Sequence, residues 1–158
     1  MKHNVYIGLG SNLGDRLGFI SDAVRRLEAS GFELVRLSKI IETPAAYVTD
    51  QPDFLNACAF MRTELDAIES LATLLGVELA MGRVRTEDKG PRNIDLDLLY
   101  WNDAILETEN LTLPHPSILE RDFVLIPLQD VAGDAFEGLL ELSRRQQASR
   151  QSPAPLPT

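Results

Sequence analysis

The sequence predicts an α+β fold of the ferredoxin-like type, a βαββαβ sandwich in which helices cover a mostly antiparallel sheet and extra helices follow toward the C-terminal end. Three observations lead to this prediction. Strand-like and helix-like spacings of apolar residues alternate along residues 4–101. Glycines and prolines interrupt the pattern where elements are expected to end. The 158 residues, of which 44% are hydrophobic and 25% charged, match one globular domain of ordinary size.

The first elements are expected to be a strand, a helix and a second strand. Every second residue is apolar over residues 4–9, which is typical of a strand. Apolar residues then recur at helical spacing from Leu17 to Leu27, and Gly31 supplies a C-terminal stop. Residues 33–41 are rich in Leu, Val and Ile and are expected to form one strand that ends before Pro44, because proline lacks the backbone donor that a sheet needs.

The next elements are expected to be a strand, a helix and a strand. Residues 54–65 return to an alternating pattern. Asp66 is a suitable N-cap for an apolar helix that ends near Gly82. Residues 94–101 predict a strand, and a tight turn after it is expected to fold residues 104–107 back as a short hairpin.

The C-terminal part is expected to add helices and then a tail. A short helix can begin at Ser117, and residues 123–131 and 136–142 have helical apolar spacing. A single domain is expected over residues 1–145. Residues 146–158, which end in a proline-rich run, are expected to be disordered because they cannot pack.

Composition excludes some classes of partner. The net charge of −9 argues against general binding to nucleic acid or to anionic membranes, which requires broad basic surface. A single cysteine, Cys58, cannot form an internal disulfide, and no Cys/His spacing is typical of zinc. Because the chain has no signal-peptide pattern and no apolar run long enough for a bilayer, we expect a cytoplasmic protein.

A small cationic cluster interrupts this acidic composition. Four of the 15 basic residues lie within ten positions, namely Arg83, Arg85, Lys89 and Arg92. A local cationic site on an acidic body suits a compact anion, and guanidinium groups match the geometry of phosphate oxygens. The alternative is an exposed loop whose charges only keep it solvated, since Glu87 and Asp88 lie in the same segment.

Asp95 and Asp97 suggest binding of a metal-bound polyphosphate. Two residues apart in a strand, they share one face, while Ile94, Leu96 and Leu98 take the other. Their Cβ atoms are then roughly 7 Å apart, so the carboxylates can converge on one Mg²⁺ or flank two. The alternative is a solvated strand face without a ligand.

Two common nucleotide-binding motifs are excluded. Gly8 and Gly10 follow a predicted strand, but Leu13 occupies the position of the third glycine in a dinucleotide fingerprint. The chain also lacks the Gly-x-x-x-x-Gly-Lys-Ser/Thr motif of P-loop kinases.

Four motifs in series resemble the 6-hydroxymethyl-7,8-dihydropterin pyrophosphokinase family: GLGSNLG at 8–14, DQPDFLN at 50–56, GPRNIDLD at 90–97 and LPHP at 113–116. The resemblance extends through residues 122–128 and leaves only the C-terminal region without a match. It implies transfer of the terminal diphosphate of ATP to the hydroxymethyl group of a reduced pterin in folate biosynthesis, with release of AMP.

The resemblance also implies roles for individual residues. The implied catalytic residues are Arg83, Arg92, Asp95 and Asp97, and the last two are the implied ligands of Mg²⁺, with two ions expected. The implied ATP contacts are Glu78, Arg83, Arg85, Arg92, Leu98, Thr112, His115 and Arg121. The implied pterin contacts are Thr43, Pro44, Ala46, Phe54, Asn56, Asp95 and Phe123, with Asn12 nearby. His115 lies between two prolines, which hold its backbone extended.

Some of these residues also have ordinary structural explanations. Without the family match, Phe54 is more simply a core residue, Asn56 a polar residue at a sheet edge, and Glu78 an exposed helical glutamate. With it, a flat pterin needs a ring to stack on and amide groups along its edge.

The chain departs from the family pattern around the cationic cluster. Lys89 stands where many members have an aromatic residue, the segment from Arg85 to Gly90 is short, and Pro116 replaces an aromatic. These changes bear on pterin affinity. Two rival functions stay open, another Mg²⁺-dependent phosphoryl or nucleotidyl transferase and a non-catalytic ligand-binding module. We expect a monomer, with a weak dimer as the alternative.

Overall fold

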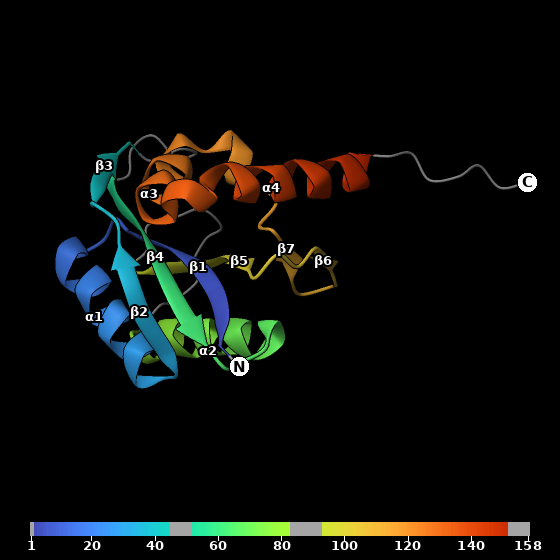
Figure 1. Ribbon diagram of the computed structural model, residues 1–158. Helices are drawn as coiled ribbons and strands as arrows, with labels where there is room; N and C mark the ends of the chain where they lie inside the picture. Colours follow the sequence, from blue (N-terminus) through green and yellow to red (C-terminus); the bar gives the residue numbers. More distant parts are fainter. Residues whose placement is uncertain (1, 45–51, 83–92, 152–158) are drawn as a thin grey trace, which may run out of the picture.

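The computed structural model describes residues 2–44, 52–82 and 93–151, and its centre is an antiparallel sheet (Figure 1). The strand order is β2-β4-β1-β5, with β3 also paired to β4. The two middle strands are therefore the first and third of the βαββαβ series, as in ferredoxin-like folds, and the predicted fold class is confirmed. The strands of this sheet are β1 His3–Ser11, β2 Phe32–Leu37, β3 Ile41–Thr43, β4 Phe54–Thr63 and β5 Asp95–Trp101.

Helices cover both faces of this sheet. In Figure 1, α1 and α2 lie on one side, and α3 and α4 lie on the other. Two short 3₁₀ helices, η1 and η2, precede α3 and α4. The helices are α1 Arg16–Ala29, α2 Ala67–Ala80, η1 Ile118–Glu120, α3 Asp122–Ala132, η2 Gly133–Ala135 and α4 Phe136–Gln151. Within the described ranges, none is long and apolar enough to cross a membrane.

Polar side chains define where the first two helices begin. The Asp15 side chain accepts a hydrogen bond from Gly18 N at the start of α1. Asp66 is the N-cap of α2, as predicted, and forms a capping box with Glu69 in which each side chain accepts from the other residue's backbone N–H. These contacts satisfy backbone donors that a helix leaves unpaired.

The sheet separates two hydrophobic cores. Val5, Ile7 and Leu9 of β1 face α1 and α2, where they pack in the larger core. Tyr6 of β1 points to the opposite face, where it packs with Tyr100 of β5 and residues of α3 and α4. This alternation follows from the strand period of two, which sends neighbouring side chains to opposite faces.

The strand predicted over residues 33–41 is interrupted. Ser38 N donates to Cys58 O at 2.9 Å, and Cys58 N donates to Ser38 Oγ at 2.8 Å. The serine hydroxyl thus accepts where a strand would offer a carbonyl, so the chain leaves the ladder after β2 and rejoins β4 as β3. Lys39 N donates instead to Asp130 Oδ2 on α3, at 2.7 Å.

The predicted hairpin of residues 104–107 onto the preceding strand is wrong. After β5, Asn102 takes a positive φ of 48°, and its side chain accepts from Asn4 N. The chain turns away from the main sheet, and β6 (Leu106–Glu107) pairs with β7 (Thr112–Leu113) in a separate two-stranded sheet. The turn was predicted at the right place, but the partner of the following strand was not.

Helix α4 continues beyond the expected domain boundary. Residues 146–151, which the sequence analysis assigned to a disordered tail, are helical. Gln146 is 3% exposed, and Gln147 Nε2 donates to Pro116 O at 3.4 Å. These contacts join the last turns of α4 to the segment that precedes η1.

Candidate functional site

Two glycines of β1 lie between β4 and β5 on one face of the sheet, and this strip of the sheet is called the trough below. Gly10 lies opposite Asp95 on one side and Asn56 on the other, and Gly8 lies opposite Asp97. Directly opposed residues of antiparallel strands present their side chains on the same face. Because glycine has no side chain, no side chain of β1 separates Asp95 from Asn56 at Gly10, whereas the Leu99 side chain lies over Gly8.

The glycine at the open end of the trough lies directly beside the expected pterin contacts. A Cβ atom at Gly10 would lie 3.4 Å from Asn56 Oδ1 and 3.6 Å from Phe54 Cδ1. At Gly8 it would lie 3.6 Å from the Leu99 side chain. The sequence shows Gly8 and Gly10 in a failed dinucleotide motif and in the GLGSNLG motif of the family resemblance, but neither predicts this role. The signal that could have identified them is their spacing of two inside a strand, which leaves one face without side chains.

Thr43, Phe54 and Asn56 come together at this end of the sheet. Asn56 is 7% exposed, and its Nδ2 donates to Thr43 Oγ1 at 2.8 Å. Thr43 is paired directly with Phe54 in the β3–β4 ladder. Since β4 is a central strand, the explanation of Asn56 as a polar residue at a sheet edge is wrong. Its amide is buried and oriented by the threonine hydroxyl.

His115 lies against the aspartate pair in one defined tautomer. His115 N donates to Leu99 O at 2.9 Å, which ties the residue to β5. Its Nδ1 accepts from Ser117 N at 3.2 Å, so a neutral ring carries its proton on Nε2. Nε2 lies 3.8 Å from Asp97 Oδ1, too far for a direct hydrogen bond.

The surroundings of His115 keep its imidazole neutral near pH 7. Burial and then the nearby Arg121 guanidinium lower the pKa of His115 to about 4, against an opposing effect of Asp95. A neutral ring with Nδ1 already engaged offers one N–H group to a ligand above the aspartates. The residue is therefore suited to donate a hydrogen bond and is a poor base.

Arg121 and Phe123 lie together where α3 begins. The guanidinium carbon of Arg121 is 5.6 Å from the centroid of the Phe123 ring, which is a cation–π distance. The Arg121 carbonyl accepts from Val124 N and Leu125 N, so its backbone starts the helix. A cation and an aromatic ring expected to contact different substrates are thus side by side.

Glu78 is buried rather than exposed. It is 4% exposed, and its Oε2 accepts from Leu96 N at 2.8 Å. The explanation of Glu78 as an exposed helical glutamate is therefore wrong. This hydrogen bond reaches the backbone between the two aspartates.

Of two further expected nucleotide contacts, Leu98 faces away from the trough and Thr112 lies in the second sheet. Leu98 is 3% exposed and packs in the core on the α1 and α2 side, so its side chain faces away from Asp97. Thr112 is half-buried in β7, where it pairs with Glu107. A contact of Leu98 with a nucleotide would have to use its backbone.

Two of the remaining predicted residues are described by the structure, and the others lie outside the described ranges. Pro44 is described and exposed at the end of β3, and Asn12 is buried, with Nδ2 donating to Pro52 O at 3.1 Å. Outside the described residues lie Arg83, Arg85, Lys89 and Arg92, together with Ala46.

The donor set of the trough suits a hard cation that also binds a ligand. Among the residues that the structure describes, no group of three or more His, Cys, Asp or Glu side chains could hold a metal ion. Asp95 and Asp97 supply carboxylate oxygens, which Mg²⁺ prefers, and Mg²⁺ commonly takes its remaining ligands from water and substrate phosphates. The two aspartates therefore fit Mg²⁺ bound together with a polyphosphate.

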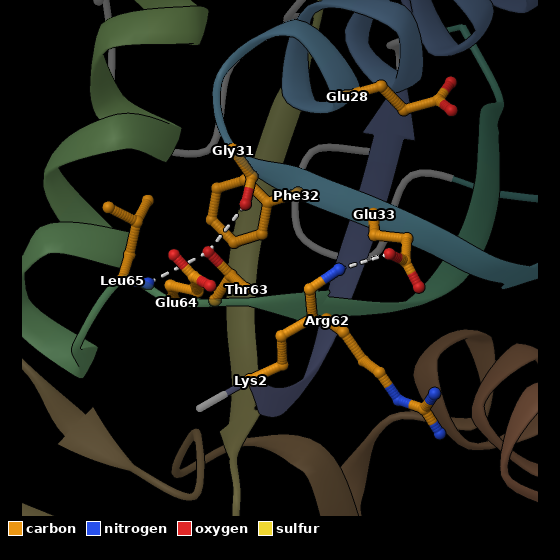
Figure 2. Close-up of a pocket in the computed structure, with 9 residues that line it drawn as sticks. All are labelled: Lys2, Glu28, Gly31, Phe32, Glu33, Arg62, Thr63, Glu64 and Leu65. Carbon is orange, nitrogen blue, oxygen red and sulfur yellow. Dashed lines mark hydrogen bonds and ion pairs between the residues drawn. The ribbon is translucent and has the colours of Figure 1, made fainter.

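A hollow of about 470 Å³ lies at the other end of the sheet (Figure 2). Its lining includes Lys2, Glu33 and Arg62, and Lys2 is ion-paired with Glu33. Because β1 starts here and reaches the trough at Gly10, the two places are roughly 24 Å apart at about 3.4 Å per residue. None of the expected site residues lines this hollow.

Comparisons with known proteins place the chain among pterin enzymes. The family model described as 7,8-dihydro-6-hydroxymethylpterin-pyrophosphokinase (HPPK) matches residues 6–133. A 2-amino-4-hydroxy-6-hydroxymethyldihydropteridine pyrophosphokinase of Methylorubrum extorquens is 43% identical over 134 residues, covering 84% of this chain and 85% of that protein. The enzyme of the same name from Synechocystis sp. is 41% identical over 133 residues, covering 84% of this chain and 68% of that one.

Other relatives are much longer. A folic acid synthesis protein of Pneumocystis carinii is 43% identical over 139 residues, which cover 88% of this chain and 19% of that protein. This chain thus spans about a fifth of that relative and 26% of a bifunctional folate synthesis protein of Pisum sativum.

Solved structures share the fold. The wild-type HPPK-DHPS of Plasmodium falciparum superposes with a TM-score of 0.64 at 13% identity, covering 96% of this chain and 46% of that one. The family match over most of the chain and the identity to two relatives that are each covered over two thirds or more of their length lead to one conclusion. The chain belongs to the 7,8-dihydro-6-hydroxymethylpterin-pyrophosphokinase family.

Proposed function

We propose that this chain transfers the terminal diphosphate of ATP to the hydroxymethyl group of 6-hydroxymethyl-7,8-dihydropterin and releases AMP. The hydroxymethyl oxygen forms a bond to the β-phosphorus, the bond from that phosphorus to the oxygen bridging to the α-phosphate breaks, and the hydroxyl proton is lost. One observation supports the proposal above all others. Asp95 lies across Gly10 from Asn56, and Asp97 shares the face of Asp95 through its pairing with Gly8, so carboxylates for a phosphate-bound cation lie across β1 from an amide for a pterin edge.

The pterin end of the proposed site consists of Thr43, Phe54, Asn56 and Phe123. A pterin is flat and carries hydrogen-bonding groups along one edge, so it needs both an aromatic face and oriented amide groups. The hydrogen bond from Asn56 Nδ2 to Thr43 Oγ1 fixes the amide and turns Oδ1 toward Gly10. The amide is therefore oriented before any ligand binds, which reduces the entropy cost of recognition.

The phosphate end consists of the aspartates with His115 and Arg121. Asp95 and Asp97 would hold Mg²⁺, with two ions expected, and the bound metal would neutralise phosphate charge and polarise the phosphorus–oxygen bonds. His115 donates through Nε2–H, and Arg121 adds a positive charge beside it. The chain's own contribution is alignment of two bound substrates and fixed donors where negative charge builds up.

The remaining roles are carried over from the family resemblance. Arg83 and Arg92 are proposed catalytic contacts to phosphate, and Arg85 is a proposed nucleotide contact. We further propose a single catalytic domain that includes the whole of α4, a cytoplasmic location and a monomeric state.

Product analysis tests the proposal. Purified protein is incubated with ATP, Mg²⁺ and 6-hydroxymethyl-7,8-dihydropterin, and AMP, ADP, diphosphate and the pterin product are separated. We expect AMP and pterin diphosphate in equal amounts, and loss of both with Asp97→Ala. Asp103→Ala, which removes an exposed aspartate beyond the end of β5, is the matched control and should retain activity.

Other product patterns would refute the proposal and identify a rival. ADP or free diphosphate as product would indicate another phosphoryl or nucleotidyl transferase. Binding of nucleotide or pterin without turnover, unaffected by Asp97→Ala, would indicate a ligand-binding module.

A further inference from the structure

The peptide that joins the two site aspartates is held by a helix instead of by the sheet. Strand β5 is at the edge of the sheet and has β1 as its only strand partner in the described structure. Leu96 lies between Asp95 and Asp97, and its N–H points away from β1 to Glu78 Oε2 on α2, at 2.8 Å. A backbone donor that an edge strand normally leaves to water is thus bonded to a buried carboxylate.

The burial of the Glu78 carboxylate needs a physical explanation, because burying a charged group lowers stability. Glu78 is 4% exposed and follows Leu74 and Val77, which pack in the larger core. Burying a carboxylate in such surroundings is unfavourable unless hydrogen bonds compensate for the lost water. An apolar side chain would pack here at lower cost, but it would leave the Leu96 N–H buried and unpaired. The hydrogen bond to β5 gives a physical reason for a side chain with an oxygen acceptor at this position.

Two further hydrogen bonds align α2 with β5. Trp101 Nε1, at the end of β5, donates to Leu65 O just before α2, at 3.1 Å. Asn93 Nδ2, just before β5, donates to Met81 O just after α2, at 2.7 Å. Helix and strand are therefore joined at both ends. The hydrogen bond from Leu96 N to Glu78 lies between these two and reaches the part of β5 that bears the aspartates.

We propose that Glu78 is a positioning residue, which acts through the Leu96 N–H to hold the backbone of Asp95 and Asp97 so that both carboxylates stay on the trough face. This inference rests on the proposed function and differs from the expectation that Glu78 contacts ATP. A peptide rotated at Leu96 would turn both neighbouring side chains. A displacement of about 1 Å in such a site can reduce turnover roughly 100-fold.

The first test measures the hydrogen bond itself, in the protein without substrate. Amide hydrogen exchange by NMR should show Leu96 N–H protected in the wild-type chain and in Glu78→Gln, which keeps an oxygen acceptor. In Glu78→Leu, exchange should be about tenfold faster, as expected for loss of one hydrogen bond. Rapid exchange at Leu96 in the wild-type protein, or unchanged exchange in Glu78→Leu, would overturn the proposal.

The second test separates positioning from contact with the nucleotide. Positioning predicts that Glu78→Leu lowers kcat by about 10- to 100-fold with little change in the KM for ATP, while Glu78→Gln stays near wild type. Direct contact by the charge predicts equal damage from both variants and a raised KM for ATP, which would refute positioning. Glu28→Leu, at an exposed site on α1, is the control for a surface Glu-to-Leu change.

The two proposals fail in different ways. If wild-type protein forms no AMP, the proposed function fails, whatever the exchange at Leu96. If wild-type protein is active but the Gln and Leu variants do not differ, only the positioning role fails. Should Glu78→Leu not fold, wild-type exchange at Leu96 and the kinetics of Glu78→Gln still decide, because an impaired Gln variant with raised KM contradicts positioning.

Discussion

Replacing Tyr100 with phenylalanine would test the connection between β5 and the C-terminal helix. Tyr100 is 1% exposed, and its hydroxyl donates to Leu139 O at 3.0 Å and shares a hydrogen bond with Ser143 Oγ at 2.6 Å. Both partners are on α4. Tyr100→Phe removes one oxygen atom and leaves the ring, so the change isolates this pair of hydrogen bonds from the packing around them.

The expected loss follows from what remains buried. Ser143 is 2% exposed, so removing its partner leaves a buried hydroxyl unsatisfied, at a cost of about 1–3 kcal/mol. A domain of this size loses roughly 2–4 °C in Tm per kcal/mol. We therefore expect Tyr100→Phe to lower Tm by about 2–12 °C.

Thermal unfolding followed by circular dichroism measures this loss. Tyr6→Phe is the matched control, because the Tyr6 hydroxyl makes no hydrogen bond within the described residues, and its Tm should change little. Ser143→Ala completes a double-mutant cycle, in which the second change should cost much less once the tyrosine hydroxyl is gone. A Tm drop no larger than that of the Tyr6 control, or strictly additive losses in the cycle, would refute the reasoning.

Three further predictions follow from the site and the core. Asp97→Asn should reduce AMP formation by about 100-fold or more, some 3 kcal/mol in the barrier, with Tm nearly unchanged; near-normal turnover would contradict a charged role. Gly10→Ala places a methyl 3.4 Å from Asn56 Oδ1 and should raise the KM for the pterin more than that for ATP; equal effects on both would contradict a pterin-side floor. Burial raises the pKa of the Cys58 thiol and raises that of Tyr100 to about 12, so the folded protein keeps protons that the unfolded chain loses. The free energy of unfolding is therefore greatest below about pH 9 and should fall as pH rises toward 12, by up to about 1.4 kcal/mol per pH unit and group, as denaturant unfolding at pH 8–11 would measure. A stability that stays flat over that range, or a slope unaffected by Tyr100→Phe, would contradict this last prediction.

The elements that the sequence predicts well are those whose pattern is set by the core. The first strand and helix α1 bury one regular apolar face each, so their apolar spacing indicates both type and position. The strand over 33–41 was misjudged because its break depends on the Ser38 hydroxyl replacing a backbone acceptor for Cys58 N, which hydrophobic spacing does not register. The partner of β6 was misjudged for a related reason, since it depends on how Asn102 turns the chain.

The candidate site could be predicted in part. Strand spacing alone indicates that Asp95 and Asp97 share a face, and the structure bears this out through their pairing with Gly10 and Gly8. The grouping of Asn56 with the aspartates across β1 depends on strand order, which no local pattern contains.

The burial of Glu78 could not be predicted from the spacing of apolar residues in its helix. Helix α2 is apolar on most sides, so its sequence does not reveal which side faces the sheet.

The contact between Glu78 and Leu96 has a consequence for solubility. An edge strand with free N–H groups invites pairing with another chain, which is a route to aggregation. On β5 the N–H of Leu96 is occupied by a buried side chain, so a foreign strand cannot add there without displacing α2. The opposite edge, β2, carries the exposed charged residues Glu33 and Arg36, which disfavour stacking of copies. The carboxylate that we propose to align the aspartates would thus also hinder pairing of β5 with a strand of another molecule.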